Sequence, residues 1–183
     1  ERDSQFQGAT VLDPMVGVHQ AVTTLDLAAL YPSIIQSGNF CFTTDITGLS
    51  SKDIDALTKQ KAVFALKDGP KKVGAFISQP VFGGILPTIL ESLGTARKRA
   101  KRMMREAKQR GDTAGHNALN ARQLALKICA NSCYGFCGSP IMKNLTVSSS
   151  VTFVGRQLLN WTKKLVEVDF VRQPSVDLGG AIP

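Results

Sequence analysis

The stretch Lys127-Ile-Cys-Ala-Asn131-Ser-Cys-Tyr134-Gly135 has the spacing of a helix that carries a binding surface. At about 100° per residue, Lys127, Asn131 and Tyr134 lie at positions i, i+4 and i+7 and project from one face. Helix faces that pack into a core are apolar, whereas a cation, an amide and an aromatic ring suit a phosphate, a base and a sugar. Gly135 predicts the end of the helix or a close approach of another backbone.

A long basic helix is predicted before this stretch, from Gly84 onward. Pro87 suits a first helical turn, and small or apolar residues recur at helical spacing from Ile89 to Ala107. Residues 91–130 hold ten Lys or Arg and three acidic residues, in a chain of formal net charge +8. This clustering favours a polyanionic partner, although a solvated helix face could also carry it.

The break at Gly111-Asp112 predicts that two helices fold back as an antiparallel hairpin. The base of the hairpin would bring Arg97 and Lys101 near Lys127 and Asn131. Three cations repel one another when no carboxylates neutralise them. Their convergence therefore predicts an anionic ligand that carries several charges.

The other predicted elements are short strands and helices, which indicate an α+β fold. We expect strands at residues 9–12, 21–25, 39–44 and 73–77, a polar turn at 67–72, and helices at 50–61, 113–134 and 149–168. Ser51 is expected to cap the first of these helices. Trp161 falls on the apolar stripe of the last helix and is expected to pack in the core.

A second candidate site lies in Asp26-Leu-Ala-Ala-Leu-Tyr31-Pro-Ser33. Asp26 follows a predicted strand, where a carboxylate in apolar surroundings is costly unless a metal ion or another group compensates its charge. Alternatively, Asp26 caps the turn or helix that follows. Pro32 is expected to form a sharp turn and to restrict Tyr31 to extended conformations, which would hold the tyrosine stiffly.

Several protein classes receive no support from the sequence. The chain has four cysteines, Cys41, Cys129, Cys133 and Cys137, which form no C-x-x-C pair, and it has two His, so we expect no zinc site. We expect the cysteines to be reduced and mostly buried. No phosphate-binding loop of the G-x-x-x-x-G-K-[ST] type and no kinase-type glycine loop is present. No apolar run approaches the ~18 to 20 residues that span a bilayer.

The candidate residues suit a nucleoside triphosphate bound together with Mg²⁺. Transfer of a phosphoryl group depends on positioning and charge neutralisation more than on covalent help from the protein. Arg97, Lys101 and Lys127 supply cations for the phosphates, and Asp26 supplies a carboxylate for a metal ion.

Two motifs resemble those of family B DNA polymerases. Asp26 to Ile34 is similar to the family's D-x-x-S-L-Y-P-S-I motif, and Lys127 to Gly135 is similar to its K-x-x-x-N-S-x-Y-G motif. Residues 84–90 and 96–101 resemble the opening of the family's fingers helices. Gly8 to Pro14 resembles the delta-type replicative enzymes of eukaryotes and large DNA viruses. The resemblance runs from about residue 6 to about residue 168.

The resemblance implies a partial polymerase palm, made of β-sheet plus helix, with an antiparallel two-helix fingers hairpin. Residues 1–83 would be the first part of the palm, residues 84–138 the fingers, and residues 139–183 an incomplete second part. The family's second carboxylate motif, Y-G-D-T-D-S, does not follow the third helix, and Asp169 and Asp177 lack its flanking residues. We therefore expect a fragment that alone binds nucleotide weakly and does not polymerise.

Roles for individual residues follow from the resemblance. Asp26 would ligate two Mg²⁺ ions, the Leu27 carbonyl would complete one coordination shell, and the remaining acidic ligands would lie elsewhere. Tyr31 would be the steric gate that rejects a 2′-hydroxyl. The expected catalytic residues are Asp26, Tyr31 and Lys127, and the expected nucleotide-binding residues are Leu27, Ala29, Leu30, Tyr31, Arg97, Lys101, Lys127, Asn131, Tyr134 and Gly135. Ala29 stands where the family has Ser, and Gly94 lies inside the first fingers helix.

The implied function is that of a DNA-directed DNA polymerase, a nucleotidyltransferase that adds deoxynucleoside triphosphates to a primer 3′ end in DNA replication. Its partners would be primer–template DNA and dNTP, with accessory subunits or a sliding clamp bound elsewhere and no membrane. It would act in the nucleus, or at a viral replication site. One alternative is a catalytically incomplete, polymerase-derived DNA-binding or scaffold module. Another is a basic hairpin that binds single strands by charge, which would not need Asp26 or Tyr31.

Overall fold

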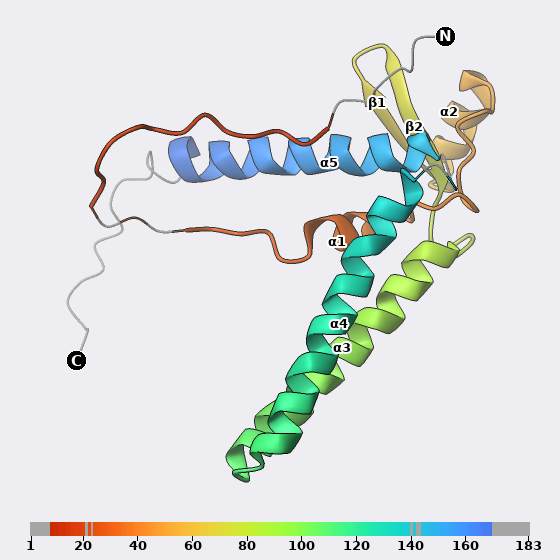
Figure 1. The fold of residues 1–183 in the computed structure, drawn as a ribbon. Coiled ribbons are helices and arrows are strands. Elements are labelled where there is room, and N and C mark those ends of the chain that lie inside the picture. Colours follow the sequence, from red (N-terminus) through yellow and green to blue (C-terminus); the bar gives the residue numbers. More distant parts are fainter. Residues whose placement is uncertain (1–7, 21, 23, 140, 142–143, 170–183) are drawn as a thin grey trace, which may run out of the picture.

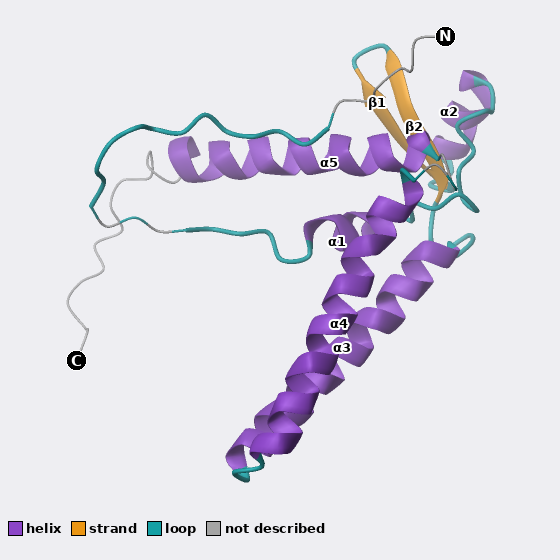
Figure 2. Ribbon diagram, in the orientation of Figure 1, coloured by secondary structure: helices purple, strands orange, loops and turns teal. Residues whose placement is uncertain are grey.

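A computed structural model describes residues 8–20, 22, 24–139, 141 and 144–169 (Figure 1). These residues form an α+β fold of five α-helices and a two-stranded antiparallel sheet, which agrees with the predicted class (Figure 2). The elements are α1 (Leu30–Ser37), α2 (Ser51–Lys59), β1 (Val63–Asp68), β2 (Lys71–Ile77), α3 (Ile85–Gln109), α4 (Thr113–Cys137) and α5 (Leu145–Lys164), followed by a π-helical turn (Leu165–Asp169).

Helices α3 and α4 form the predicted antiparallel hairpin, which projects from the rest of the fold as a two-helix arm (Figure 1). Gly111 takes a φ of 71° at the turn, a left-handed conformation that glycine adopts without strain. The side chain of Asp112 accepts a hydrogen bond from the Gly115 amide at 2.8 Å and so caps α4. The break that the sequence predicts at this point is confirmed.

The prediction that Gly135 ends the second helix is wrong. Helix α4 continues through Gly135 to Cys137, and Gly138 is its C-terminal cap. A Cβ atom at position 135 would meet nothing within 4 Å in the described part of the chain, so no backbone approaches closely there. A single glycine inside a helix costs only about 1 kcal/mol, which the contacts of the last turn of α4 with the core can offset.

The predicted sharp turn at Pro32 is also wrong, because this segment forms helix α1. Pro32 is the third residue of the helix, in the first turn, where a missing backbone N–H breaks no helical hydrogen bond. Tyr31 is therefore helical rather than extended. Ala29 precedes the helix with a φ of 50° and a ψ of 45°, a left-handed conformation that is uncommon for alanine.

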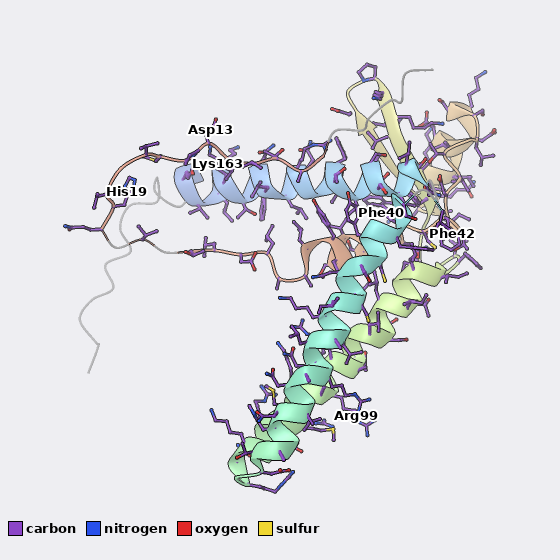
Figure 3. The ribbon with its side chains drawn as sticks, viewed as in Figure 1. Asp13, His19, Phe40, Phe42, Arg99 and Lys163 are labelled. Carbon is purple, nitrogen blue, oxygen red and sulfur yellow. The ribbon has the colours of Figure 1, made fainter. Side chains whose placement is uncertain are left out.

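One hydrophobic core joins the base of the hairpin to α1, the sheet and the start of α5. Phe40 lies at this junction (Figure 3), with its ring centroid 4.7 Å from that of Phe76 in β2. The other buried members are Ile34, Ile35, Cys41, Leu66, Leu86, Leu90, Cys137, Val147, Val151 and Phe153. The core therefore fixes the first turns of α3 and the last turns of α4 against α1.

Asn39 ties three segments together beneath the hairpin. Its Nδ2 donates hydrogen bonds of 2.8 Å to the carbonyls of Ile77 and Phe82, and its Oδ1 accepts one of 2.9 Å from the Gly84 amide. The side chain is 1% exposed and the backbone has a φ of 52°, which asparagine tolerates better than most residues. The end of α1 is thus joined to the end of β2 and the start of α3.

The expected strands at 9–12 and 39–44 are absent from the described chain. Residues 8–20 run alongside α5 and pair with no described strand (Figure 1). Arg156 Nη1, from α5, donates a 2.8 Å hydrogen bond to the Gly8 carbonyl. Within the expected strand at 21–25, residues 21 and 23 lie outside the described residues, and the others form no strand. Residues 42–44 form a turn. A strand requires a hydrogen-bonded partner, which local residue preference cannot supply.

The expected strand at 73–77 is confirmed and begins earlier, at Lys71. It pairs with β1, which the sequence interpretation missed because it assigned residues 67–72 to a turn. The expected helix at 50–61 is confirmed as α2, with Ser50 rather than Ser51 as its cap: Ser50 Oγ accepts from the Asp53 amide at 3.2 Å.

Helix α5 confirms the third predicted helix but begins earlier than expected, at Leu145. The Asn144 side chain caps it by accepting a hydrogen bond from the Val147 amide at 2.9 Å. Its buried residues lie between Val147 and Gly155, and Trp161 is 62% exposed, so the expected core packing of Trp161 is wrong within the described chain. None of the described helices is both long and apolar enough to cross a membrane.

Candidate functional site

A cavity of about 650 Å³ lies at the base of the hairpin, between α1, α3, α4 and the segment that precedes α1. Seven of the ten residues expected to bind nucleotide line it, together with Asp26. These seven are Ala29, Leu30, Tyr31, Arg97, Lys101, Lys127 and Asn131. Residues far apart in the sequence therefore meet at one cavity, as the hairpin prediction required.

Three expected site residues do not line this cavity. Leu27 is half-buried between two lining residues, Asp26 and Ala28. Tyr134 does not line the cavity but contacts the ring of Tyr31, which does. Gly135 is exposed on α4, with open space where a side chain would be.

Three cations face the cavity from the two hairpin helices, Arg97 and Lys101 from α3 and Lys127 from α4. The Nε of Arg97 donates to Gln123 Oε1 at 3.3 Å, which orients the guanidinium group. None of the three takes part in the ion pairs of the described residues, which join Lys67 to Asp55, Arg102 to Glu106 and Lys163 to Glu167. Cations converging without carboxylate partners favour an anion with several charges.

Tyr31 forms one side of the cavity and is supported by a second aromatic ring. The ring centroids of Tyr31 and Tyr134 are 4.5 Å apart, with their planes tilted by 48°. Burial, followed by the nearby Tyr31 phenol, raises the pKa of Tyr134 above its ordinary value. The Tyr134 phenol, like an ordinary tyrosine, is protonated at neutral pH and can donate a hydrogen bond, and the raised pKa extends this state to more alkaline pH.

Asp26 is the one acidic side chain among the residues lining the cavity. It is exposed and precedes α1 in an irregular segment, so the expectation that it ends a strand is wrong. No group of three or more His, Cys, Asp or Glu within the described ranges is arranged so that it could hold a metal ion. Divalent ions in two-metal sites take several oxygen ligands, so the Asp26 carboxylate by itself would not suffice for such a site. Asp177 and the side chain of Asp169 lie outside what the structure describes.

A second cavity, of about 640 Å³, lies along the hairpin and contains Glu91, Arg99 and Arg122. Figure 3 shows Arg99 on α3, along the projecting part of the hairpin and away from α1. No residue of α1 or of the segment before it lines this cavity. The cavity at the base is therefore the better candidate, because it combines cations, a carboxylate and an aromatic wall.

Two residues that support the site were not anticipated from the sequence. Gln123 holds Arg97, and it lies four residues before Lys127 on the same face of α4, a spacing that could have identified it. Asn39 joins α1 to α3 at the base of the hairpin. In the sequence, only its position directly after Gly38, the C-terminal cap of α1, indicates its left-handed backbone.

Comparison with known proteins bears on this arrangement. The family model described as DNA polymerase family B matches residues 1–178. The chain is 44% identical over 169 residues to the DNA polymerase delta catalytic subunit of Arabidopsis thaliana, covering 90% of the chain and 14% of that protein. It is 40% identical over 176 residues to the Drosophila melanogaster subunit of the same name, covering 93% of the chain and 15% of that protein.

The fission yeast Schizosaccharomyces pombe has a DNA polymerase delta catalytic subunit that is 40% identical over 168 residues, covering 90% of the chain and 15% of that protein. The chain thus spans 14–15% of the length of these curated relatives. The similarity includes both motifs that meet at the cavity, and it extends over nearly the whole chain. The chain therefore belongs to DNA polymerase family B.

Proposed function

We propose that the chain provides the nucleotide-binding part of a DNA-directed DNA polymerase, which adds deoxynucleoside triphosphates to a primer 3′ end in DNA replication. The observation that carries the proposal is the cavity at the base of the hairpin, where Asp26 and Tyr31 meet the cations of α3 and α4. Membership of DNA polymerase family B supports it, as do relatives named DNA polymerase delta catalytic subunits.

In this proposal, residues 84–138 are the fingers, and residues 1–83 and 139–183 belong to the palm. Support comes from the shape of the chain: α3 and α4 project as a separate arm, while α1, the sheet and the start of α5 share one core with the base of that arm (Figure 1). Within the described residues, the core holds the hairpin at its base. A hairpin anchored in this way can change its angle to the core and so close over a ligand in the cavity.

The cations have distinct roles in binding a triphosphate. Arg97 presents a planar guanidinium, held by Gln123, that can donate two parallel hydrogen bonds to one phosphate. Lys101 and Lys127 are exposed and act as point charges from opposite helices. Asn131 lies one helical turn beyond Lys127, so its amide would reach the adjoining part of the nucleotide.

Tyr31 would lie beneath the sugar and exclude a 2′-hydroxyl by its bulk. Its ring is suited to this because Tyr134 supports it from one side. Tyr134 and Gly135, which follow on α4, would line the nascent base pair. The open space at Gly135 in the described chain leaves room for that base pair to approach the helix.

Asp26 is the described carboxylate placed to hold Mg²⁺, with the Leu27 carbonyl beside it. Bound divalent ions would neutralise the charge that develops on the phosphate during transfer. Because Asp26 alone cannot hold two ions, the remaining carboxylates would come from residues outside the described part of the polypeptide. Primer–template DNA would be the other substrate, and accessory replication subunits or a sliding clamp would bind elsewhere. The eukaryotic relatives favour a nuclear location, with a viral replication site as the alternative.

The second candidate is a catalytically incomplete DNA-binding or scaffold module. It is favoured because Asp26 is the one carboxylate among the described residues that line the cavity. Primer extension distinguishes the two. We expect the full-length polypeptide that carries this segment to extend a DNA primer with Mg²⁺ and dNTP, whereas the 183-residue chain alone binds dNTP weakly and extends nothing. A full-length polypeptide that binds primer–template but never extends it would contradict the polymerase proposal and favour the scaffold.

A further inference from the structure

Gly155 lies in α5 where this helix packs against α1, and it is buried. A Cβ atom at this position would lie 3.3 Å from Tyr31 Cε1, 3.7 Å from Ile34 Cδ1 and 4.0 Å from Leu30 Cδ2. Carbon atoms that are not bonded pack best at about 3.5–4.0 Å, so only the contact with the Tyr31 ring would be too close. The lack of a side chain at Gly155 therefore leaves room for the edge of the Tyr31 ring.

The ring has limited freedom to yield to such a contact. The α1 backbone is held by Ile34 and Ile35, whose exposed fractions are 2% and 0%, and Tyr134 supports the ring at 4.5 Å. No residue of α5 lines the cavity, although Tyr31 does, so α5 lies behind the ring as seen from the cavity. A methyl group at position 155 would therefore push the ring toward the cavity.

Helix stability does not explain a glycine here. Glycine is one of the poorest helix formers and alanine the best, so glycine at position 155 weakens α5. The two other glycines inside described helices close to the site, Gly94 and Gly135, have nothing within 4 Å of an added Cβ. Among these three, Gly155 alone has a neighbour that a methyl group would displace, and that neighbour is the proposed steric gate.

We propose that Gly155 is a positioning residue for Tyr31: its missing side chain sets how far the ring projects into the cavity, and with it the strength of discrimination against ribonucleotides. The inference rests on the proposed function, because it assumes that Tyr31 contacts the sugar. With alanine at position 155 the ring projects further. The space beside the 2′ carbon then narrows, which hinders a ribonucleotide more than a deoxynucleotide.

The test measures single-nucleotide incorporation opposite a template dG by the full-length polypeptide, with dCTP and with CTP. Four proteins are compared with the wild type: Gly155→Ala, Tyr31→Ala, the double variant, and Gly48→Ala as the control. Gly48 is exposed, and an added Cβ there meets nothing within 4 Å, so its substitution tests the general effect of glycine replacement.

For Gly155→Ala we expect the KM for dCTP to rise about fivefold and the preference for dCTP over CTP to increase about threefold or more, because sub-ångström shifts near a reacting substrate have effects of this order. Tyr31→Ala should weaken the preference, and adding Gly155→Ala to it should then change nothing, since the ring that transmits the effect is gone. Gly48→Ala should match the wild type.

Two results overturn the inference in different ways. If Tyr31→Ala weakens the preference but Gly155→Ala slows dCTP and CTP equally, Gly155 has only a structural role, and the proposed function stands. If Tyr31→Ala leaves the preference unchanged, Tyr31 does not contact the sugar, and the inference fails together with that part of the proposed function.

Thermal unfolding covers the case in which Gly155→Ala does not fold. The double variant of Gly155→Ala and Tyr31→Ala lacks the ring that would clash. If the double variant is as stable as Tyr31→Ala alone, the contact between position 155 and the Tyr31 ring is supported. A double variant that unfolds while Tyr31→Ala remains folded overturns it.

Discussion

The ring centroids of Tyr31 in α1 and Tyr134 in α4 are 4.5 Å apart, with planes tilted by 48°. This contact joins the helix that follows Asp26 to the hairpin helix that carries Lys127. Aromatic pairs of this geometry contribute about 0.5–1.5 kcal/mol beyond the area that they bury. A ligand that draws α4 toward the cavity therefore also acts on Tyr31.

Replacing Tyr134 tests this link. Tyr134→Ala should raise the KM for dNTP in the full-length polypeptide about two- to tenfold, because Tyr31 loses its supporting ring. Tyr134→Phe keeps the ring and should stay close to the wild type. Steady-state incorporation kinetics would measure both, and equal defects in the two variants would show that the hydroxyl, not the ring contact, matters.

The cavity cations should control nucleotide affinity. Lys127→Ala should raise the dissociation constant for dNTP about 10- to 100-fold, since a hydrogen bond to a charged group contributes about 1.5–3 kcal/mol. Lys98→Ala is the matched control, because Lys98 is an exposed cation on α3 that does not line the cavity. Titration of a fluorescent dNTP analogue measures both. If Lys127→Ala and Lys98→Ala lose the same amount of affinity for dNTP, the nucleotide is held by non-specific charge attraction, which the single-strand-binding alternative predicts.

Asn39 should matter for stability because its side chain joins three segments. Asn39→Ala removes hydrogen bonds to the carbonyls of Ile77 and Phe82 and from the Gly84 amide, and should lower the free energy of unfolding by about 2–4 kcal/mol. Asn160→Ala, at an exposed position of α5, should change it by less than about 0.5 kcal/mol. Urea unfolding compares them, and similar values for the two variants would contradict the role of Asn39.

Cys137 should make the chain less stable at alkaline pH. Cys137 is 1% exposed, and burial, followed by the neighbouring Cys41 and Cys133, raises the pKa of its thiol from 9.0 to about 11. Above pH 9 the unfolded chain loses this proton while the folded chain keeps it, so the free energy of unfolding should fall between pH 9 and about pH 11. The contribution of this thiol is fully present below pH 9.

In Cys137→Ala, the free energy of unfolding should fall less between pH 9 and about pH 11 than in the wild type. The substitution also lowers stability at every pH, because packing is lost. Unfolding measured from pH 7 to pH 11 tests the difference between the two profiles. Parallel profiles would show that Cys137 does not titrate differently in the folded and unfolded states.

Local signals in the sequence were sufficient to predict the hairpin. The Gly111-Asp112 break and the spacing of Lys127 and Asn131 predicted two antiparallel helices and the placing of these residues near Arg97, and the structure places them around one cavity. Each of these signals acts over a few residues, so the rest of the fold does not alter them.

Elements that depend on distant partners were not predictable in this way. The apolar residues at 9–12 favour a strand, yet no described strand pairs with them. Pro32 suggested a turn, although the first turn of a helix accepts proline equally well. The relation between Gly155 and Tyr31 joins α5 to α1, and only the packed structure shows it.

Asp26 offers the most direct test of the polymerase proposal. Asp26→Asn keeps the size of the side chain and removes its charge, so primer extension with Mg²⁺ by the full-length polypeptide should fall by at least about 100-fold. Asp13→Asn, at an exposed carboxylate that does not line the cavity, is the control and should keep the wild-type rate. If Asp26→Asn extends the primer as fast as Asp13→Asn, the cavity at the base of the hairpin is not the catalytic site.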